Sequence, residues 1–117
     1  MDRIGQTYSV LTVSAADKFS ASLHTLLPEG QYDPVRAVRD AASARRLLLE
    51  RSYDIVLINT PLPDDFGTRL ALDISETSGA GVLLLVKAEQ YPELSARLTP
   101  NGILTLQKPT TPQLLTQ

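Results

Sequence analysis

Residues 53–63 read Tyr-Asp-Ile-Val-Leu-Ile-Asn-Thr-Pro-Leu-Pro, and this stretch decides the fold of the chain. Its apolar core, residues 55–58, gives way at Asn59 to a polar turn with two prolines. A short, continuous apolar run is typical of a strand that is covered on both faces, as in a parallel sheet. The stretch therefore predicts a buried strand over residues 54–59, followed by a loop.

Four more strands and five helices fit the sequence around this run. Strong strands are expected at residues 8–13 and 81–86, and weaker ones at 34–38 and 103–106. Helices are expected between the strands and at the end of the chain. They run from an Asp17 cap to Leu27, from an Asp40 cap to Arg51, from Asp64 or Asp65 to Thr77, from Pro92 to before Pro100, and from Thr111 to Gln117.

Strand and helix alternate five times, which favours parallel strands joined by right-handed helical crossovers. With 117 residues the chain is one domain, spanning residues 1–117. The expected fold is a three-layer α/β sandwich with a five-stranded parallel sheet. The last helix has room for only about two turns, so we expect it to be short or truncated and the chain to be the N-terminal part of a longer protein.

The composition excludes several functional classes. The chain has no cysteine, so it can form neither a disulfide framework nor a thiolate metal site, and this fits a cytoplasmic protein. Its longest apolar runs are far shorter than a membrane span. The net charge is 11 − 13 = −2 without a dominant basic stripe, so a nucleic-acid surface is not expected in this segment.

Ligands of open α/β sheets bind at the carboxyl ends of the strands. The residues that follow the expected strands are therefore the candidate site. They include Ser14, Ala15, Asn59, Thr60, Val86, Lys87, Gln107 and Lys108.

Residues 53–63 resemble the third strand and following loop of CheY-like response-regulator receivers. Lys108-Pro109 after a short strand, with Leu114 and Leu115 close behind, is similar to the fifth-strand motif of that family. The resemblance covers about residues 8–115. It implies the flavodoxin-like (βα)5 fold with strand order 2-1-3-4-5, and a cis peptide bond before Pro109.

The resemblance also implies five functional positions, with the acidic pair counted as one, and only one of them keeps the family's residue. The acidic pair that holds Mg²⁺ is replaced by Ser14 and Ala15, and the phospho-accepting aspartate by Asn59. The hydroxyl and aromatic switch positions hold Val86 and Thr105, and only Lys108 is retained.

This set of residues argues against phosphorylation chemistry. A phosphoryl group is accepted by a carboxylate nucleophile, and the Asn59 amide does not form an acyl phosphate. Mg²⁺ prefers carboxylate oxygens, and Ser14, Ala15 and Asn59 offer none. We therefore expect neither a metal site, nor a cofactor, nor catalytic residues.

The roles of two residues stay open at this point. Lys108 could contact an anion, or it could be a relic whose ammonium reaches solvent or bonds to Asn59. Asn59 could mimic one fixed signalling state, or it could serve as a polar loop residue that satisfies nearby backbone groups.

The sequence thus predicts a pseudo-receiver, meaning a receiver-like regulatory module that works without phosphorylation. By resemblance, it would control a transcription or antitermination output domain of a response-regulator-type protein through protein contacts. It could form a homodimer through the fourth helix, fifth strand and fifth helix. The alternative is a small-molecule or anion sensor that uses the cleft at the carboxyl ends of the strands.

Overall fold

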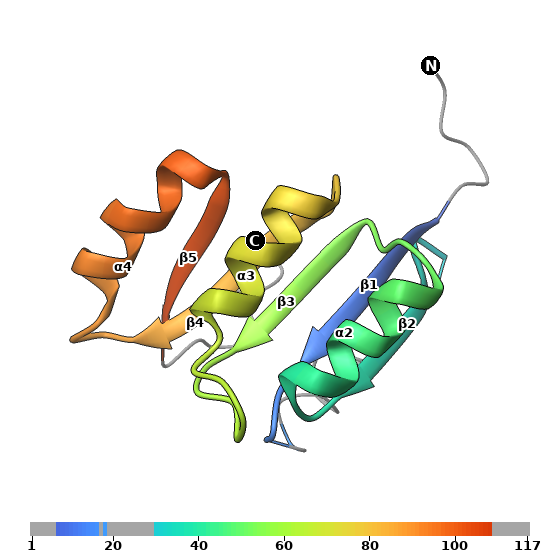
Figure 1. The fold of residues 1–117 in the computed structure, drawn as a ribbon, viewed down its shortest axis with the longest axis horizontal. Helices are drawn as coiled ribbons and strands as arrows, with labels where there is room; N and C mark the ends of the chain where they lie inside the picture. Colours follow the sequence, from blue (N-terminus) through green and yellow to red (C-terminus); the bar gives the residue numbers. More distant parts are fainter. Residues whose placement is uncertain (1–6, 17, 19–29, 109–117) are drawn as a thin grey trace.

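A computed structural model describes residues 7–16, 18 and 30–108 (Figure 1). In chain order, its elements are β1 (Tyr8–Val13), β2 (Tyr32–Val38), α2 (Ala41–Glu50), β3 (Ile55–Asn59), α3 (Thr68–Thr77), β4 (Gly81–Lys87), α4 (Tyr91–Leu98), a 3-10 turn (Thr99–Asn101) and β5 (Ile103–Lys108). The five predicted strands are confirmed, and β2 and β5 each extend two residues beyond their predicted range.

All five strands are parallel and lie in the order β2-β1-β3-β4-β5, which confirms the predicted topology. Figure 1 shows α2, α3 and α4 on one face of the sheet. Because the strands are parallel, their carboxyl ends meet at one edge, and the residues that follow them are brought together there.

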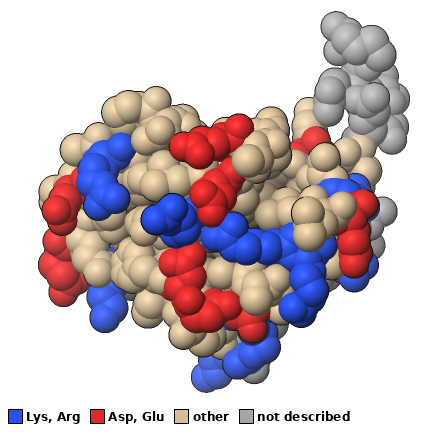
Figure 2. Space-filling model, viewed as in Figure 1, with Lys and Arg blue, Asp and Glu red and all other residues tan. Residues whose placement is uncertain are grey.

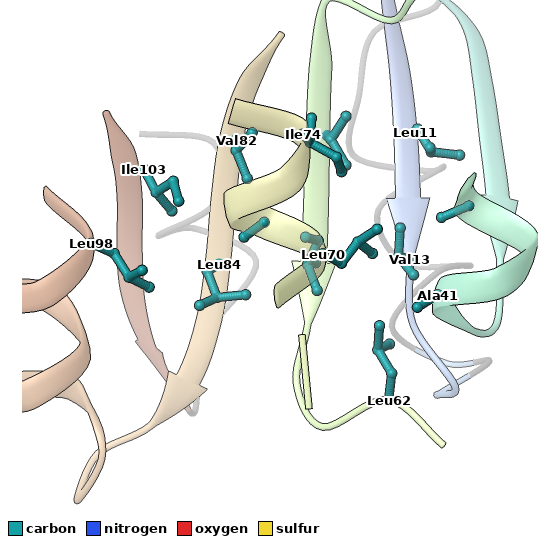
Figure 3. Packing of buried hydrophobic residues seen from close by; sticks show 14 of the residues in the cluster. Leu11, Val13, Ala41, Leu62, Leu70, Ile74, Val82, Leu84, Leu98 and Ile103 are labelled. Atoms are coloured by element: carbon teal, nitrogen blue, oxygen red, sulfur yellow. The ribbon is translucent and has the colours of Figure 1, made fainter. Parts of the chain in front are cut away.

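The core lies mainly between the sheet and these three helices (Figure 3). Side chains from alternate strand positions, such as Val13, Ile58 and Leu84, are fully buried there. The intervening positions point to the opposite face, where Leu57 and Leu85 form a second buried cluster. Burial on both faces explains why the central strands are continuously apolar in sequence.

The starts of α2 and α3 differ in how they are capped. The prediction for α2 is confirmed, because the Asp40 carboxylate accepts a hydrogen bond from the Ser43 N–H at 2.8 Å. The predicted cap of α3 is wrong: that helix begins after Gly67, without a side-chain cap. Asp64 instead accepts from the first two N–H groups of α2, and Asp65 accepts from the Gly67 N–H at 3.3 Å.

Three predictions concern residues outside the described part of the chain. Apart from Lys18, which is described, the first helix from Asp17 to Leu27 lies there, as do the fifth helix from Thr111 and the cis bond before Pro109. Within the described residues, the cis peptide bond joins Thr60 to Pro61. The described helices are all too short to cross a membrane.

Candidate functional site

The carboxyl edge of the sheet brings together Ser14, Asn59, Val86 and Lys108. Val13 pairs with Ile58, and Asn59 pairs with Leu85, so Ser14 and Asn59 lie next to each other just beyond the β1–β3 ladder. Val86 pairs with Gln107 on β5, one residue before Lys108. The structure therefore gathers at one edge the positions that sequence analysis selected.

Ser14 and Asn59 form a neutral pair. The Asn59 Nδ2 donates a hydrogen bond to the Ser14 Oγ at 3.0 Å, and that oxygen also accepts from the Ala16 N–H at 3.1 Å. The Ser14 hydroxyl lies 3.4 Å from the Ala16 carbonyl oxygen and can donate to it. Ser14 is only 1% exposed, so this contact is shielded from water. The half-buried Ala15 adds only a methyl group.

Asn59 leaves one polar atom unsatisfied. Its Oδ1 is buried and has no hydrogen-bond partner within the described part of the chain. A buried acceptor without a partner costs roughly 1–3 kcal/mol. Among the described residues, the Asn59 amide therefore bonds to a side chain, Ser14, and its oxygen satisfies no neighbouring backbone group.

Lys108 reaches across the edge from β5 to the loop after β3. Its ammonium donates to the backbone carbonyl of Thr60, a partner that was not among the expected ones, namely an anion, solvent or Asn59. Thr60 is itself buried and fixed, because its N–H and its hydroxyl both donate to the Leu85 carbonyl, at 3.1 and 2.7 Å. The start of the loop after β3 is thus fixed by two contacts: Thr60 bonds to Lys108 on β5 and to Leu85 on β4.

Two causes lower the pKa of Lys108 below its ordinary value of 10.5. Burial is the larger cause, and the positive charge of Lys87, its register partner on β4, adds to it. Both act in the same direction, because each disfavours the charged form of the amine.

Lys87→Met is therefore expected to raise the pKa of Lys108, while burial keeps it below 10.5. Between the folded and unfolded pKa values the unfolded chain binds more protons, so the free energy of unfolding rises with pH there. Lys87→Met should therefore narrow the pH range over which the free energy of unfolding rises, because it brings the folded pKa of Lys108 closer to the unfolded one. NMR titration of the Lys108 side chain measures the pKa, and an unchanged value would show that the two ammonium groups do not interact.

The two positions that the resemblance assigns to a switch, Val86 and Thr105, lie within the core, on the face covered by α3 and α4. Val86 is fully buried and has no hydroxyl to offer to the edge. Thr105 is also buried, and its Oγ1 has no hydrogen-bond partner among the described residues.

The donor set at this edge does not fit a divalent cation. Mg²⁺ needs hard, preferably charged oxygen ligands, but the described residues here supply a hydroxyl, an amide and a methyl group. Within residues 7–16, 18 and 30–108, no cluster of three metal-ligating side chains occurs. The nearby carboxylates of Asp40 and Asp64 are engaged with N–H groups of α2.

The fold and strand order are those of the flavodoxin-like receiver domains of response regulators. The signal receiver domain of an HD domain-containing protein from Pseudomonas fluorescens Pf-5 matches with a TM-score of 0.78 and 27% identity, over 98% of this chain and 83% of that chain. A response-regulator receiver domain from Clostridium thermocellum matches with a TM-score of 0.78 and 18% identity, over 93% and 88%. A two-component response regulator from Clostridium difficile matches with a TM-score of 0.80 and 17% identity, over 94% of this chain and 89% of that chain. No protein-family model and no curated protein matches the sequence.

Sequence reasoning missed the roles of Thr60 and Asp64. Thr60 acts through its backbone carbonyl, which no side-chain pattern reveals. Asp64 had a visible signal, since an aspartate beside a helix start is a typical cap. The helix that it caps is α2, which lies more than twenty residues earlier in the chain.

Proposed function

We propose that this chain is a receiver-like regulatory module that works without phosphorylation and acts through protein contacts. The observation that carries the proposal is the hydrogen bond between the Asn59 amide and the Ser14 hydroxyl. It occupies the place where a phosphorylatable receiver needs carboxylates for its metal and for the phosphoryl group. The neutral pair is already satisfied at Ser14 without any ion.

The proposal includes a role as a non-enzymatic, cytoplasmic part of a response-regulator-type protein, with a transcription or antitermination domain as its output. The support for this part is the receiver fold alone, which hosts many functions. Figure 2 adds that acidic and basic side chains are interspersed on the helical face. A protein partner suits such a surface better than the phosphate backbone of a nucleic acid.

The proposed contact for a homodimer comprises α4, β5 and the helix expected after it. Leu104 on β5 is 56% exposed, which is unusual for a large apolar side chain on an edge strand. Burying it against a second copy would remove this apolar surface from water.

A second candidate function is supported by the two lysines. Lys87 and Lys108 lie side by side in register at the edge, and neither forms an ion pair with another described residue. Two cations without carboxylates could attract a small oxyanion, such as inorganic phosphate, in the absence of a metal.

Thermal unfolding in the presence of different ions distinguishes the two candidates. A regulatory module without phosphorylation chemistry should show no rise in Tm with millimolar Mg²⁺ and beryllofluoride. A ligand that binds only the folded state at a hundred times its Kd stabilises it by about 2.7 kcal/mol. A saturable rise with phosphate that Lys108→Met abolishes would favour the anion sensor, and a rise that requires Mg²⁺ would contradict the proposal.

A further inference from the structure

We propose that residues 60–67, called the strap below, transmit a change at the Lys108 ammonium to the start of α2. The strap leaves the sheet at the end of β3 and returns to begin α3 (Figure 1). On the way, Asp64 reaches the N-terminus of α2. The device does not depend on whether the chain can be phosphorylated.

The strap is held at its beginning by Lys108. Thr60 has its side chain and N–H bonded to Leu85, and its carbonyl accepts from the lysine ammonium. Any anion or partner carboxylate that draws this ammonium outward removes one of the groups that orient the Thr60 carbonyl, and with it the direction in which the strap leaves β3.

In its middle, the strap is bound to α2 by hydrogen bonds to Asp64. The two carboxylate oxygens of Asp64 accept from Ala41 N–H at 2.9 Å and from Ala42 N–H at 3.0 Å. These N–H groups have no partner within the helix itself. A carboxylate is also favoured at a helix N-terminus by the helix dipole. The start of α2 therefore depends on a residue of the strap as well as on its own Asp40.

Between Thr60 and Asp64, the strap is packed into the core at Leu62. Leu62 is buried in the core cluster that includes Ala41, and Figure 3 shows it pointing toward Ala41 and Val13. The Leu62 N–H is bonded within the strap, at 3.0 Å from the Asp65 carbonyl oxygen. Of the three residues between Thr60 and Asp64, Leu62 is the buried one, and Pro61 and Pro63 are exposed. A displacement at Thr60 is thus passed to Asp64 through Leu62, which is both packed and hydrogen-bonded.

Movement of the strap would change the surface around α2. That surface differs from the one near Val86 and Thr105, which lie on β4 and β5. Beyond its N-terminus, α2 is tied to α3 by the Arg45–Asp73 ion pair at 2.9 Å. A loosening of the first turn of α2 would consequently alter the surface that α2 and α3 form together.

Amide hydrogen exchange at the first turn of α2 tests the proposal, because it reports local opening. Lys108→Met is expected to speed exchange at Ala41 and Ala42 by about threefold, and Asp64→Asn by about tenfold, within the range for the loss of a cap. Ser43 should stay unchanged in both variants, because its N–H is held by Asp40 and not by the strap.

Two matched controls accompany these variants. Lys87→Met removes one positive charge from the same edge without touching Thr60, and Asp65→Asn alters the strap carboxylate that does not reach α2. Neither should change exchange at Ala41 and Ala42. Where Lys108→Met does not fold, Lys108→Arg, which keeps the charge but changes the donor geometry, is expected to act in the same direction.

Three outcomes would overturn the proposal. In the first, Lys108→Met leaves Ala41 and Ala42 unchanged while Asp64→Asn speeds their exchange, which would show a cap without transmission. In the second, Lys87→Met acts as strongly as Lys108→Met, which would show a general charge effect. In the third, Ser43 accelerates together with Ala41 and Ala42, which would show loss of the whole helix.

Discussion

Asn59→Asp alone is expected to give no more than weak Mg²⁺ binding in a calorimetric titration. The substitution supplies one carboxylate, but Ser14 and Ala15 beside it remain uncharged. A small, hard ion that loses water reluctantly gains little from a single carboxylate. The protein should still fold, because the Ser14 hydroxyl can donate to the new carboxylate where it now accepts from the amide.

Adding Ser14→Asp and Ala15→Asp is expected to produce measurable Mg²⁺ affinity. Three carboxylates would then lie at the same edge of the sheet, and Ser14→Asp would introduce a charge at a position that is 1% exposed. Charges buried without a partner are costly. The triple variant should therefore be less stable than the parent without the metal, and its Tm should rise as Mg²⁺ is added.

The single variant is the informative comparison. Full affinity of Asn59→Asp would mean that another carboxylate, such as Asp17, which lies outside the described residues, already serves the metal. The chain would then be one substitution away from an active receiver. A triple variant that folds but binds no Mg²⁺ would mean that these positions do not converge as described.

Gly67→Ala is expected to destabilise the fold by about 2–5 kcal/mol, which is large against a typical domain stability of about 5–15 kcal/mol. Gly67 has φ +130°, a conformation that other residues rarely adopt. A Cβ there would lie 2.9 Å from the Thr60 Cγ2 and 3.2 Å from the Ile58 Cγ2. Both neighbours belong to buried residues that cannot move aside easily. Chemical denaturation measures the loss.

Gly102→Ala is the matched control for this substitution. Gly102 also has a positive φ, +79°, but a Cβ there would meet nothing within 4 Å. Gly102→Ala should lower the free energy of unfolding by only about 1–2 kcal/mol, the cost of the left-handed backbone conformation for a residue with a Cβ. Equal losses in the two variants would show that the close approach of α3 to Thr60 contributes nothing.

The strands were predictable because burial on both faces leaves a direct mark on the sequence. Residues 55–58 and 82–86 are continuously apolar, and the structure places them in the middle of the sheet. The start of α3 was not predictable by the same reasoning. Asp64 and Asp65 are good caps by residue type, but the chain makes a further turn at Gly67, where packing against Thr60 leaves no room for a side chain.

The positions of the candidate site could be predicted, but their contacts could not. Strand ends in a parallel sheet must meet, so Ser14, Asn59 and Lys108 had to share an edge. The choice of Thr60 as the partner of Lys108 depends on the path of the loop after β3. That path is set by contacts to β4 and α2 that are distant in sequence.

The most direct test of the central claim is phosphotransfer to the parent chain. The protein is incubated with acetyl phosphate and millimolar Mg²⁺, and its intact mass is measured before any acyl phosphate can hydrolyse, with a competent receiver treated in parallel. We expect a phosphoryl adduct on the competent receiver and none on this chain, because Asn59 provides no carboxylate nucleophile. An adduct on this chain that requires Mg²⁺ would contradict this expectation and show that the chain is a phosphorylatable receiver.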